Sequence, residues 1–160
     1  SRLATTNRAN RRMIASSREE AVTDLLTGLA NRRSLNVHLE RALDAERGRT
    51  TVLALFDLNG FKSYNDSFGH TAGDDLLQRL GAALGAAVAP WGQAYRLGGD
   101  EFCVLAPTEK VKASTIVGAA QAALSDRGPG FSISASCGTR VPQARVNASS
   151  TAASNVNVSE

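Results

Sequence analysis

The hydrophobic positions of this chain fall into short apolar runs of strand length separated by stretches with helical spacing. Three leucines at four-residue intervals predict a core-facing helix that follows an N-cap at Asn31 and ends near Gly48. The almost unbroken apolar run at 51–58 predicts a strand that is covered on both faces. The first third of the chain is therefore expected to supply one helix and one buried strand.

Two helices are expected after this strand. The first is short, at 61–68, and the second occupies 71–88 and is closed by Pro90. The apolar face of the second helix consists of Leu76, Leu77, Leu80, Leu84 and Val88. This spacing indicates a helix that packs along its whole length against a sheet.

Two short strands, 95–97 and 102–105, flank Gly98 and Gly99. Glycine readily takes the positive φ values that a tight hairpin turn requires. A helix at about 109–126 and a strand at 131–137, in which apolar residues alternate with serines, complete the pattern. The sequence thus predicts a β-hairpin followed by one helix and one strand.

The predicted order is β, α, β, β, α, β. It is the order of the ferredoxin-like fold of the α+β class, an α/β sandwich in which an antiparallel sheet carries its helices on one face. In this arrangement the end of the first strand and the tip of the hairpin lie at the same edge of the sheet. We therefore expect Asp57 to meet Asp100 and Glu101 there.

Length and composition indicate one domain with an extension at each end, since 160 residues with 42% hydrophobic content suffice for one core. Residues 1–23 predict a weakly amphipathic connector helix, or else a frayed exposed helix. The domain spans 24–140. Residues 141–160 are polar and of low complexity, which predicts a disordered tail.

The apolar stretches are too short for a membrane segment, which needs about 20 residues. We therefore expect a cytoplasmic chain, either free or as the cytosolic part of a membrane-anchored sensor. Cys103 and Cys137 lie in strand patterns without metal-ligand spacing, which favours buried free thiols. The basic excess comes from the ten arginines of residues 1–50, and with 5% aromatic residues no nucleic-acid groove is predicted.

The three acids expected at the sheet edge have a chemical consequence. Carboxylates held about 4 Å apart repel by roughly 4 kcal/mol per pair at an effective dielectric constant near 20. They must share protons or bind cations, and oxygen ligands without His or Cys favour a hard ion such as Mg²⁺ or Mn²⁺. An ordinary polar hairpin is the alternative that the hairpin sequence alone leaves open.

Four segments in sequence order resemble the signatures of the GGDEF family of diguanylate cyclases. They are DLLTGLANRR at 24–33, DLNGFKSYND at 57–66, FGHTAGDDLL at 68–77 and RLGGDEF at 96–102. The resemblance covers 24–138. It implies a palm-type sheet like that of other nucleotide cyclases and the joining of two GTP molecules into cyclic di-GMP, with release of two pyrophosphates, by a homodimer.

The resemblance also assigns roles to individual residues. It places two Mg²⁺ or Mn²⁺ ions per site on Asp57, the Leu58 carbonyl, Asp100 and Glu101, with Asp100 and Glu101 as the catalytic acids. For GTP it implies guanine contacts from Asn65 and Asp74, triphosphate contacts from Phe61 and Lys62, and a close approach at Gly98 and Gly99. An upstream sensor domain, absent from this chain or removed from it, is the implied source of the signal.

The sequence departs from the family pattern after Gly138. The Lys and Arg that relatives direct at the triphosphate are missing, a loss of about 3 to 6 kcal/mol at 1.5 to 3 kcal/mol for each charged hydrogen bond. A truncation, a frameshift or a divergent terminus would explain this. A catalytically silent module that binds GTP weakly or only dimerises is therefore a second hypothesis, and a nucleotidyl cyclase with another product is a third.

A product-binding motif of many relatives, Arg-x-x-Asp, is also missing. Counted from Gly98, its two positions are occupied by Ala89 and Gly92, which carry no charge. We therefore expect no inhibitory binding of cyclic di-GMP outside the active site.

Overall fold

The computed structural model describes residues 22–45 and 50–142. The connector helix predicted at 1–23, the helix end predicted near Gly48 and the tail predicted at 141–160 lie almost entirely outside these ranges. In chain order the elements are β1 (Ala30–Asn31), α2 (Arg32–Ala45), β2 (Thr51–Asn59), α3 (Phe61–Phe68), α4 (His70–Val88), β3 (Gln93–Gly98), β4 (Glu101–Pro107), α5 (Ala113–Ala123), β5 (Asp126–Gly128) and β6 (Phe131–Arg140).

The elements predicted within the described residues are all present. The short helix α3 has its predicted bounds, and α4 begins one residue before the predicted Thr71. The helix α5 is shorter than the predicted 109–126, because Lys112 before it is extended and Leu124 after it leaves helical geometry. The strands β1 and β5 were not predicted, since two and three residues show no periodicity.

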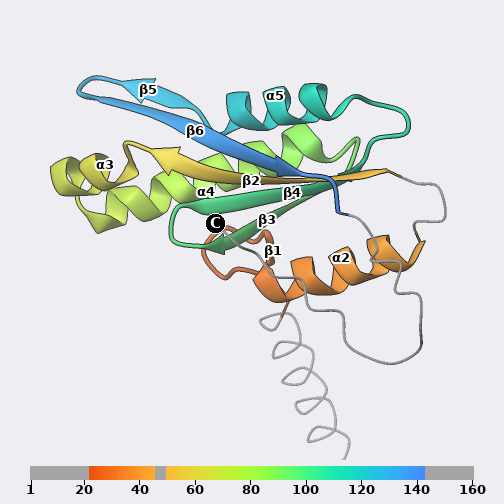
Figure 1. Cartoon of the computed structure of the whole chain (residues 1–160). Coiled ribbons are helices and arrows are strands. Elements are labelled where there is room, and N and C mark those ends of the chain that lie inside the picture. Colours follow the sequence, from red (N-terminus) through yellow and green to blue (C-terminus); the bar gives the residue numbers. More distant parts are fainter. Residues whose placement is uncertain (1–21, 46–49, 143–160) are drawn as a thin grey trace, which may run out of the picture.

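One sheet of six strands, in the order β1-β3-β4-β2-β6-β5, forms the centre of the domain (Figure 1). The four strands β3, β4, β2 and β6 pair antiparallel, which confirms the ferredoxin-like order. The added strand β1 pairs parallel with β3, so the sheet is mixed at that edge. The strand β2 lies between β4 and β6, and its last residues are held by neighbours on both sides.

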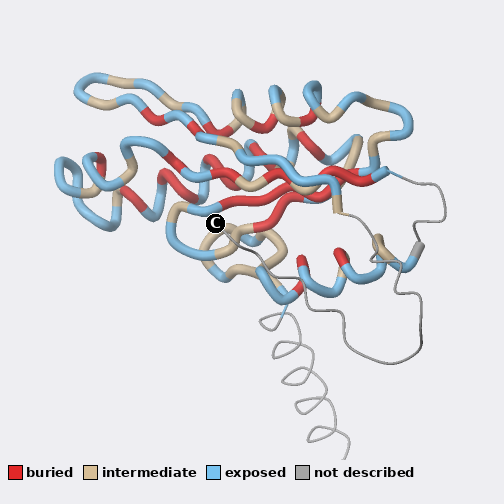
Figure 2. Tube along the Cα trace, viewed as in Figure 1, coloured by how far each residue is buried: buried red, intermediate tan, exposed pale blue. Residues whose placement is uncertain are grey.

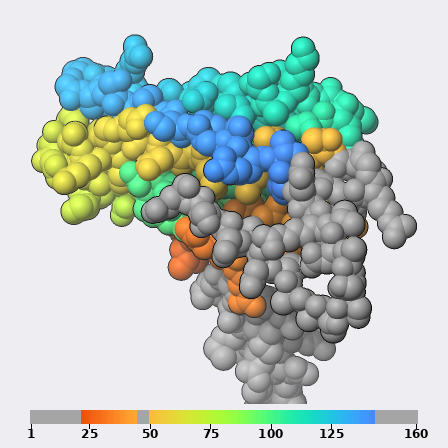
Figure 3. Space-filling view, in the orientation of Figure 1, coloured from red at the N-terminus to blue at the C-terminus, as the bar shows by residue number. Residues whose placement is uncertain are grey.

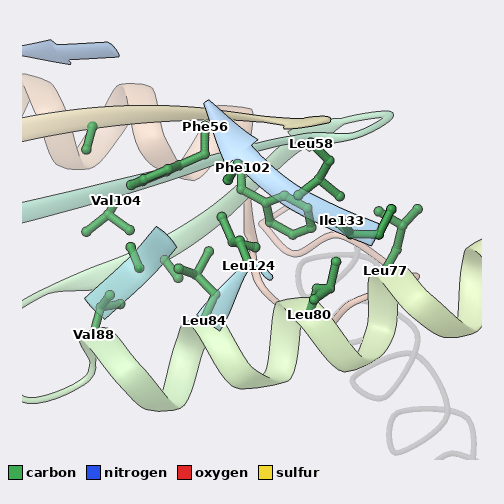
Figure 4. Close-up of a cluster of buried hydrophobic side chains, with 14 of the residues drawn as sticks. Phe56, Leu58, Leu77, Leu80, Leu84, Val88, Phe102, Val104, Leu124 and Ile133 are labelled. Atoms are coloured by element: carbon green, nitrogen blue, oxygen red, sulfur yellow. The ribbon is translucent and has the colours of Figure 1, made fainter. Parts of the chain in front are cut away.

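The main core lies between the sheet and the helices α4 and α5. On β2, residues Val52, Ala54, Phe56 and Leu58 face these helices, and the buried leucines of α4 point back at them (Figure 4). The tube view shows this buried layer as a continuous band through the middle strands and the inner sides of the helices (Figure 2). The core therefore fixes which face of β2 each residue occupies.

The prediction that the helices share one face of the sheet is wrong for α2. Its Leu35 and Leu39 pack with Tyr95, Cys103 and Leu105 in a second cluster, on the face opposite α4 and α5 (Figure 1). The reason is that β4 is apolar on both faces, so each face needs a cover. The N-cap prediction is confirmed, because Asn31 Oδ1 accepts the Ser34 amide at 3.1 Å.

No helix in the described part of the chain combines the length and the apolar content that crossing a membrane would need. Both cysteines carry free thiols, and burial raises the pKa of the Cys103 thiol to about 12. Cys103 is thus a small apolar core residue, as its strand pattern predicts, whereas the prediction of burial is wrong for Cys137, which is only partly buried.

Candidate active site

The candidate site is built at the end of β2, where the chain leaves the sheet next to the β3–β4 turn. Asp57 pairs with Glu101 across the β2–β4 ladder, which confirms the predicted meeting of the two strands at one edge. The Leu58 amide donates a hydrogen bond to the Asp100 carbonyl at 3.2 Å. The hairpin turn is therefore fixed directly beside the last residues of β2.

Asp57 and Glu101 project from the sheet face that α2 covers, because alternate residues of β2 and β4 face α4. A groove of about 740 Å³ runs along this face between α2 and the strands β2 and β6. Its walls are mainly apolar, and Asp57, Glu101, Arg32, Asn36, Glu40 and Ser136 are among the polar side chains that line it. The acids thus lie beside a hollow of nucleotide size.

The acids interact electrostatically. The pKa of Asp57 is raised by its partial removal from water, by the negative charges of Asp100 and Glu101, and by a hydrogen bond with Asp100. Arg32 offsets part of this repulsion, since its Nη2 lies 3.6 Å from Glu101 Oε2. In residues 22–45 and 50–142, no three His, Cys, Asp or Glu side chains form an arrangement ready to hold a metal ion.

The turn itself depends on its two glycines. Gly98 has φ 130° and Gly99 has φ 52°, values that other residues adopt only with strain. A Cβ atom at either position would meet no other atom within 4 Å. The glycines are therefore required for backbone conformation, and they leave the space above the turn free.

The α3 and α4 helices meet at a second group of predicted residues. The Oδ1 atom of Asn65 is buried and accepts no hydrogen bond, and a Cβ atom at Gly73 would collide with it. Asp74 follows Gly73 and is exposed. An unpaired buried acceptor costs about 1 to 3 kcal/mol, so Asn65 is suited to a ligand with a hydrogen-bond donor.

The N-terminus of α3 follows Asn59 directly, after Gly60 turns the chain with φ 86°. Tyr64 is the first residue whose amide bonds back to the Gly60 carbonyl, so the amides of Phe61 and Lys62 have no partner within the helix. Phe61 packs against the main core, and Lys62 is exposed. Both residues are held where a phosphate group would find free amides.

Three polar groupings around the site were not predicted. They are the Arg32–Glu101 ion pair, the hydrogen bonds of Asn59 with Ser134 and Ser136, and the link from Asp24 to Arg96. Arg32, Asp24 and Arg96 lie within the segments at 24–33 and 96–102 that resemble the family signatures, and this resemblance was the available signal. The pairing of Asp24 with Arg96 depends on the register of β1 with β3, which no periodicity in the sequence reveals.

Residues 21–145, more than half of the chain, match the protein family described as "Diguanylate cyclase, GGDEF domain". The chain belongs to the GGDEF family. The diguanylate cyclase DgcP of Pseudomonas aeruginosa is 39% identical over 98 residues, which cover 60% of this chain and 15% of DgcP. An uncharacterized protein encoded 5′ of hutH in Streptomyces griseus is 49% identical over 107 residues, 64% of this chain and 44% of that protein.

Solved GGDEF structures share the fold. The coiled coil and GGDEF domain of DgcB from Caulobacter crescentus, solved in complex with c-di-GMP, gives a TM-score of 0.70 at 30% identity and covers 86% of this chain and 80% of its own. The diguanylate cyclase SiaD of Pseudomonas aeruginosa, in complex with its activator SiaC, gives 0.70 at 27% identity, covering 90% of this chain and 58% of SiaD. This chain spans less than half the length of the two curated relatives named above.

Proposed function

We propose that this GGDEF domain is a diguanylate cyclase that condenses two GTP molecules into cyclic di-GMP and releases two pyrophosphates. The observation that carries the proposal is the pairing of Asp57 with Glu101, beside Asp100 and a glycine turn. Two strands far apart in sequence place mutually repelling acids at the edge of an open groove. An arrangement that raises the pKa of an exposed carboxyl is typical of a functional site.

The donor types suit two Mg²⁺ or Mn²⁺ ions, and the acids would have to draw together to hold them, because the described residues form no metal-ready group. Asp57, Asp100 and Glu101 offer carboxylate oxygens, and the Leu58 carbonyl faces the hairpin, because the amide and carbonyl of one strand residue leave on the same side. Glu101 must leave Arg32 to join them, and both side chains are more than half exposed, so this exchange is cheap. When bound, the ions would polarise the α-phosphate and lower the pKa of the attacking 3′-hydroxyl.

The residues proposed to contact the guanine base lie at the junction of α3 and α4, outside the lining of the groove that Asp57 and Glu101 border. The unpaired Asn65 Oδ1 is buried against Gly73 and would have to turn outward to accept a hydrogen bond from guanine, whereas the exposed Asp74 carboxylate can accept from the N1 and exocyclic amine groups. The free amides of Phe61 and Lys62 and the bare turn at Gly98 and Gly99 leave room for the triphosphate. Each site thus holds one GTP.

The reaction needs two such sites facing each other in a homodimer. The 3′-oxygen of one GTP forms a bond to the α-phosphorus of the other, the bond to pyrophosphate breaks, and Asp100 accepts the hydroxyl proton. The same step in the opposite direction closes the ring. Each protomer orients one of the two GTP molecules and supplies the charged groups around it.

A catalytically silent module is the second candidate function. It is favoured by the sequence after Gly138, which lacks the Lys and Arg that relatives direct at the triphosphate, and by the Arg32–Glu101 pair, which occupies one acid. Such a module would bind GTP weakly or only dimerise. A silent module differs from a cyclase in that it can bind GTP but forms no cyclic di-GMP.

The test is to incubate the 160-residue chain with GTP and Mg²⁺ and to assay cyclic di-GMP by mass spectrometry. The Glu101→Gln variant, which keeps the shape of the side chain and removes its charge, is the matched control. We expect product from the parent chain and none from the variant. GTP binding without product in the parent chain would establish the silent module and refute the cyclase.

A further inference from the structure

Arg96 is the side chain that joins the hairpin turn to the start of the domain. Its Nε and Nη2 atoms donate to the Gly99 carbonyl at 3.1 and 2.7 Å, and its Nη1 donates to Asp24 Oδ1 and Oδ2 at 3.1 and 3.0 Å. The Arg96 side chain is 10% exposed and that of Asp24 is 19% exposed. Shielding from water strengthens the attraction between the two charges, and the several hydrogen bonds of Asp24 and Arg96 offset the loss of hydration.

The Gly99 carbonyl belongs to the peptide that carries Asp100. The two glycines of the turn have no side chains that could pack, so hydrogen bonds from other residues must hold that peptide in place. Arg96 holds it on one side and the Leu58 amide holds Asp100 on the other. The position of Asp100 relative to Asp57 therefore depends on the direction of the Arg96 guanidinium.

Asp24 sets that direction. Its Oδ2 also accepts the amide and the hydroxyl of Thr27 at 2.8 and 2.7 Å, and its backbone closes the turn to Gly28 and Leu29. Burial acts to raise the pKa of Asp24, but the hydrogen bonds from Thr27 and the charge of Arg96 outweigh it, so the net pKa is lowered. Asp24 is thus a rigid, ionised anchor at the start of the described chain.

We propose that Arg96 and Asp24 are positioning residues for the acids of the site, so that the turn at 24–29 controls where Asp100 lies. The link joins β3 to the segment that directly follows residues 1–21. A displacement of that segment would pull on Asp24, turn the guanidinium and move the Gly99–Asp100 peptide. The consequence for catalysis rests on the proposed cyclase function, while the positioning itself does not.

The planar fork of arginine is needed for this role. Its two outer nitrogens reach Asp24 and Gly99 at the same time, whereas a lysine ammonium is a single point that can satisfy one of them. Arg96→Lys keeps the positive charge but cannot contact Asp24 and the Gly99 carbonyl at the same time. Asp24→Asn keeps the shape and removes the charge that holds the guanidinium.

The test is hydrogen exchange of single amides, measured by NMR on the full chain. The Leu58 amide is the reporter because its acceptor is the Asp100 carbonyl, and Val104 in the buried middle of β4 reports global opening. We expect Leu58 exchange to rise about tenfold relative to Val104 in Asp24→Asn and in Arg96→Lys, about 1.4 kcal/mol in local opening free energy. The double variant should be no faster than Arg96→Lys, because both act on one guanidinium.

Arg79→Gln is the matched control. It breaks the ion pair of Arg79 with Asp126, 2.9 Å long, which joins α4 to β5 away from the acids. We expect it to leave the ratio of Leu58 to Val104 exchange unchanged. If Asp24→Asn also leaves this ratio unchanged and lowers only the melting temperature, the link is merely structural and the proposal is wrong.

Turnover then separates this proposal from the cyclase assignment. In a working cyclase, Asp24→Asn should lower kcat about tenfold with KM for GTP changed less than twofold, because Asp24 touches no substrate. If the parent chain makes no cyclic di-GMP but Leu58 exchange responds as expected, the positioning role holds and the cyclase function fails. If Asp24→Asn keeps both the parent's ratio of Leu58 to Val104 exchange and the parent's kcat, the positioning role is wrong and the cyclase function stands.

Discussion

Replacing Asp57 by Asn should stabilise the metal-free protein at pH 7. The variant removes one of three mutually repelling carboxylates, and the amide keeps the size of the side chain. Because Asp57 is exposed, water screens the repulsion to about 1 kcal/mol for each pair at 4 Å, well below the roughly 4 kcal/mol expected for a less solvated cluster. Two ionised carboxylates have no proton to share, so no hydrogen bond with Asp100 is lost at pH 7, and screening by salt further reduces the gain from the two pairs.

A net gain of about 1 kcal/mol corresponds to a rise of about 3 to 6 °C in melting temperature for a domain of this size. The pH dependence has a definite sign. The pKa of Asp57 is raised on folding, so the penalty is absent below the unfolded value and grows as the pH rises through the folded value. The advantage of the variant should therefore appear above about pH 4 and vanish below it.

Thermal unfolding with and without Mg²⁺ is the assay. Mg²⁺ should raise the melting temperature of the parent chain and leave that of Asp57→Asn nearly unchanged, because a ligand stabilises the folded state only where it binds that state. Asp75→Asn, at an exposed acid of α4, is the control and should behave like the parent. A variant that is less stable than the parent at pH 7 would refute the repulsion argument, and a variant that responds to Mg²⁺ as the parent does would refute the metal assignment.

Three further outcomes are expected. Gly99→Ala should cost about 1 kcal/mol or more in unfolding free energy, seen by urea denaturation, because φ is 52° there, whereas Gly118→Ala, with open space and a helical backbone, should not destabilise. Asn65→Ala should abolish the preference for GTP over ATP in competition with a fluorescent GTP analogue, and equal displacement of that analogue by ATP from the parent chain would contradict the guanine assignment. Asn31→Ala should lower the unfolding free energy by about 1 kcal/mol, since it removes the cap of α2.

The ferredoxin-like order was predictable because each of its elements is long enough to show a period. The run at 51–58 and the leucine face of α4 define a strand and a helix, and the glycine pair defines the turn between β3 and β4. The meeting of Asp57 with Glu101 follows from the topology alone. No distance between particular side chains is needed to predict it.

The rest of the site could not be predicted from pattern. The cover on the second face of the sheet depends on β4 being apolar on both sides, and alternation does not tell which helix supplies that cover. The Asp24–Arg96 link requires the parallel pairing of β1 with β3, a strand of only two residues. Asn59 shows a similar limit, since its hydrogen bonds to Ser134 and Ser136 depend on the β2–β6 register.

The structure adds a reason why an inhibitory product site is not easily restored in this chain. Position 92, where relatives with that site carry Asp, is a glycine whose Cβ position would collide with the Leu105 carbonyl and with Ala106 of β4. Gly92→Asp would therefore push the α4–β3 connection away from the sheet before its carboxylate could orient an arginine. Ala89 lies free at the end of α4, so an arginine fits there alone. Binding of cyclic di-GMP to the parent chain is accordingly expected to compete with GTP, and submicromolar binding with the active site blocked by a non-hydrolysable GTP analogue would show that a different surface takes the product.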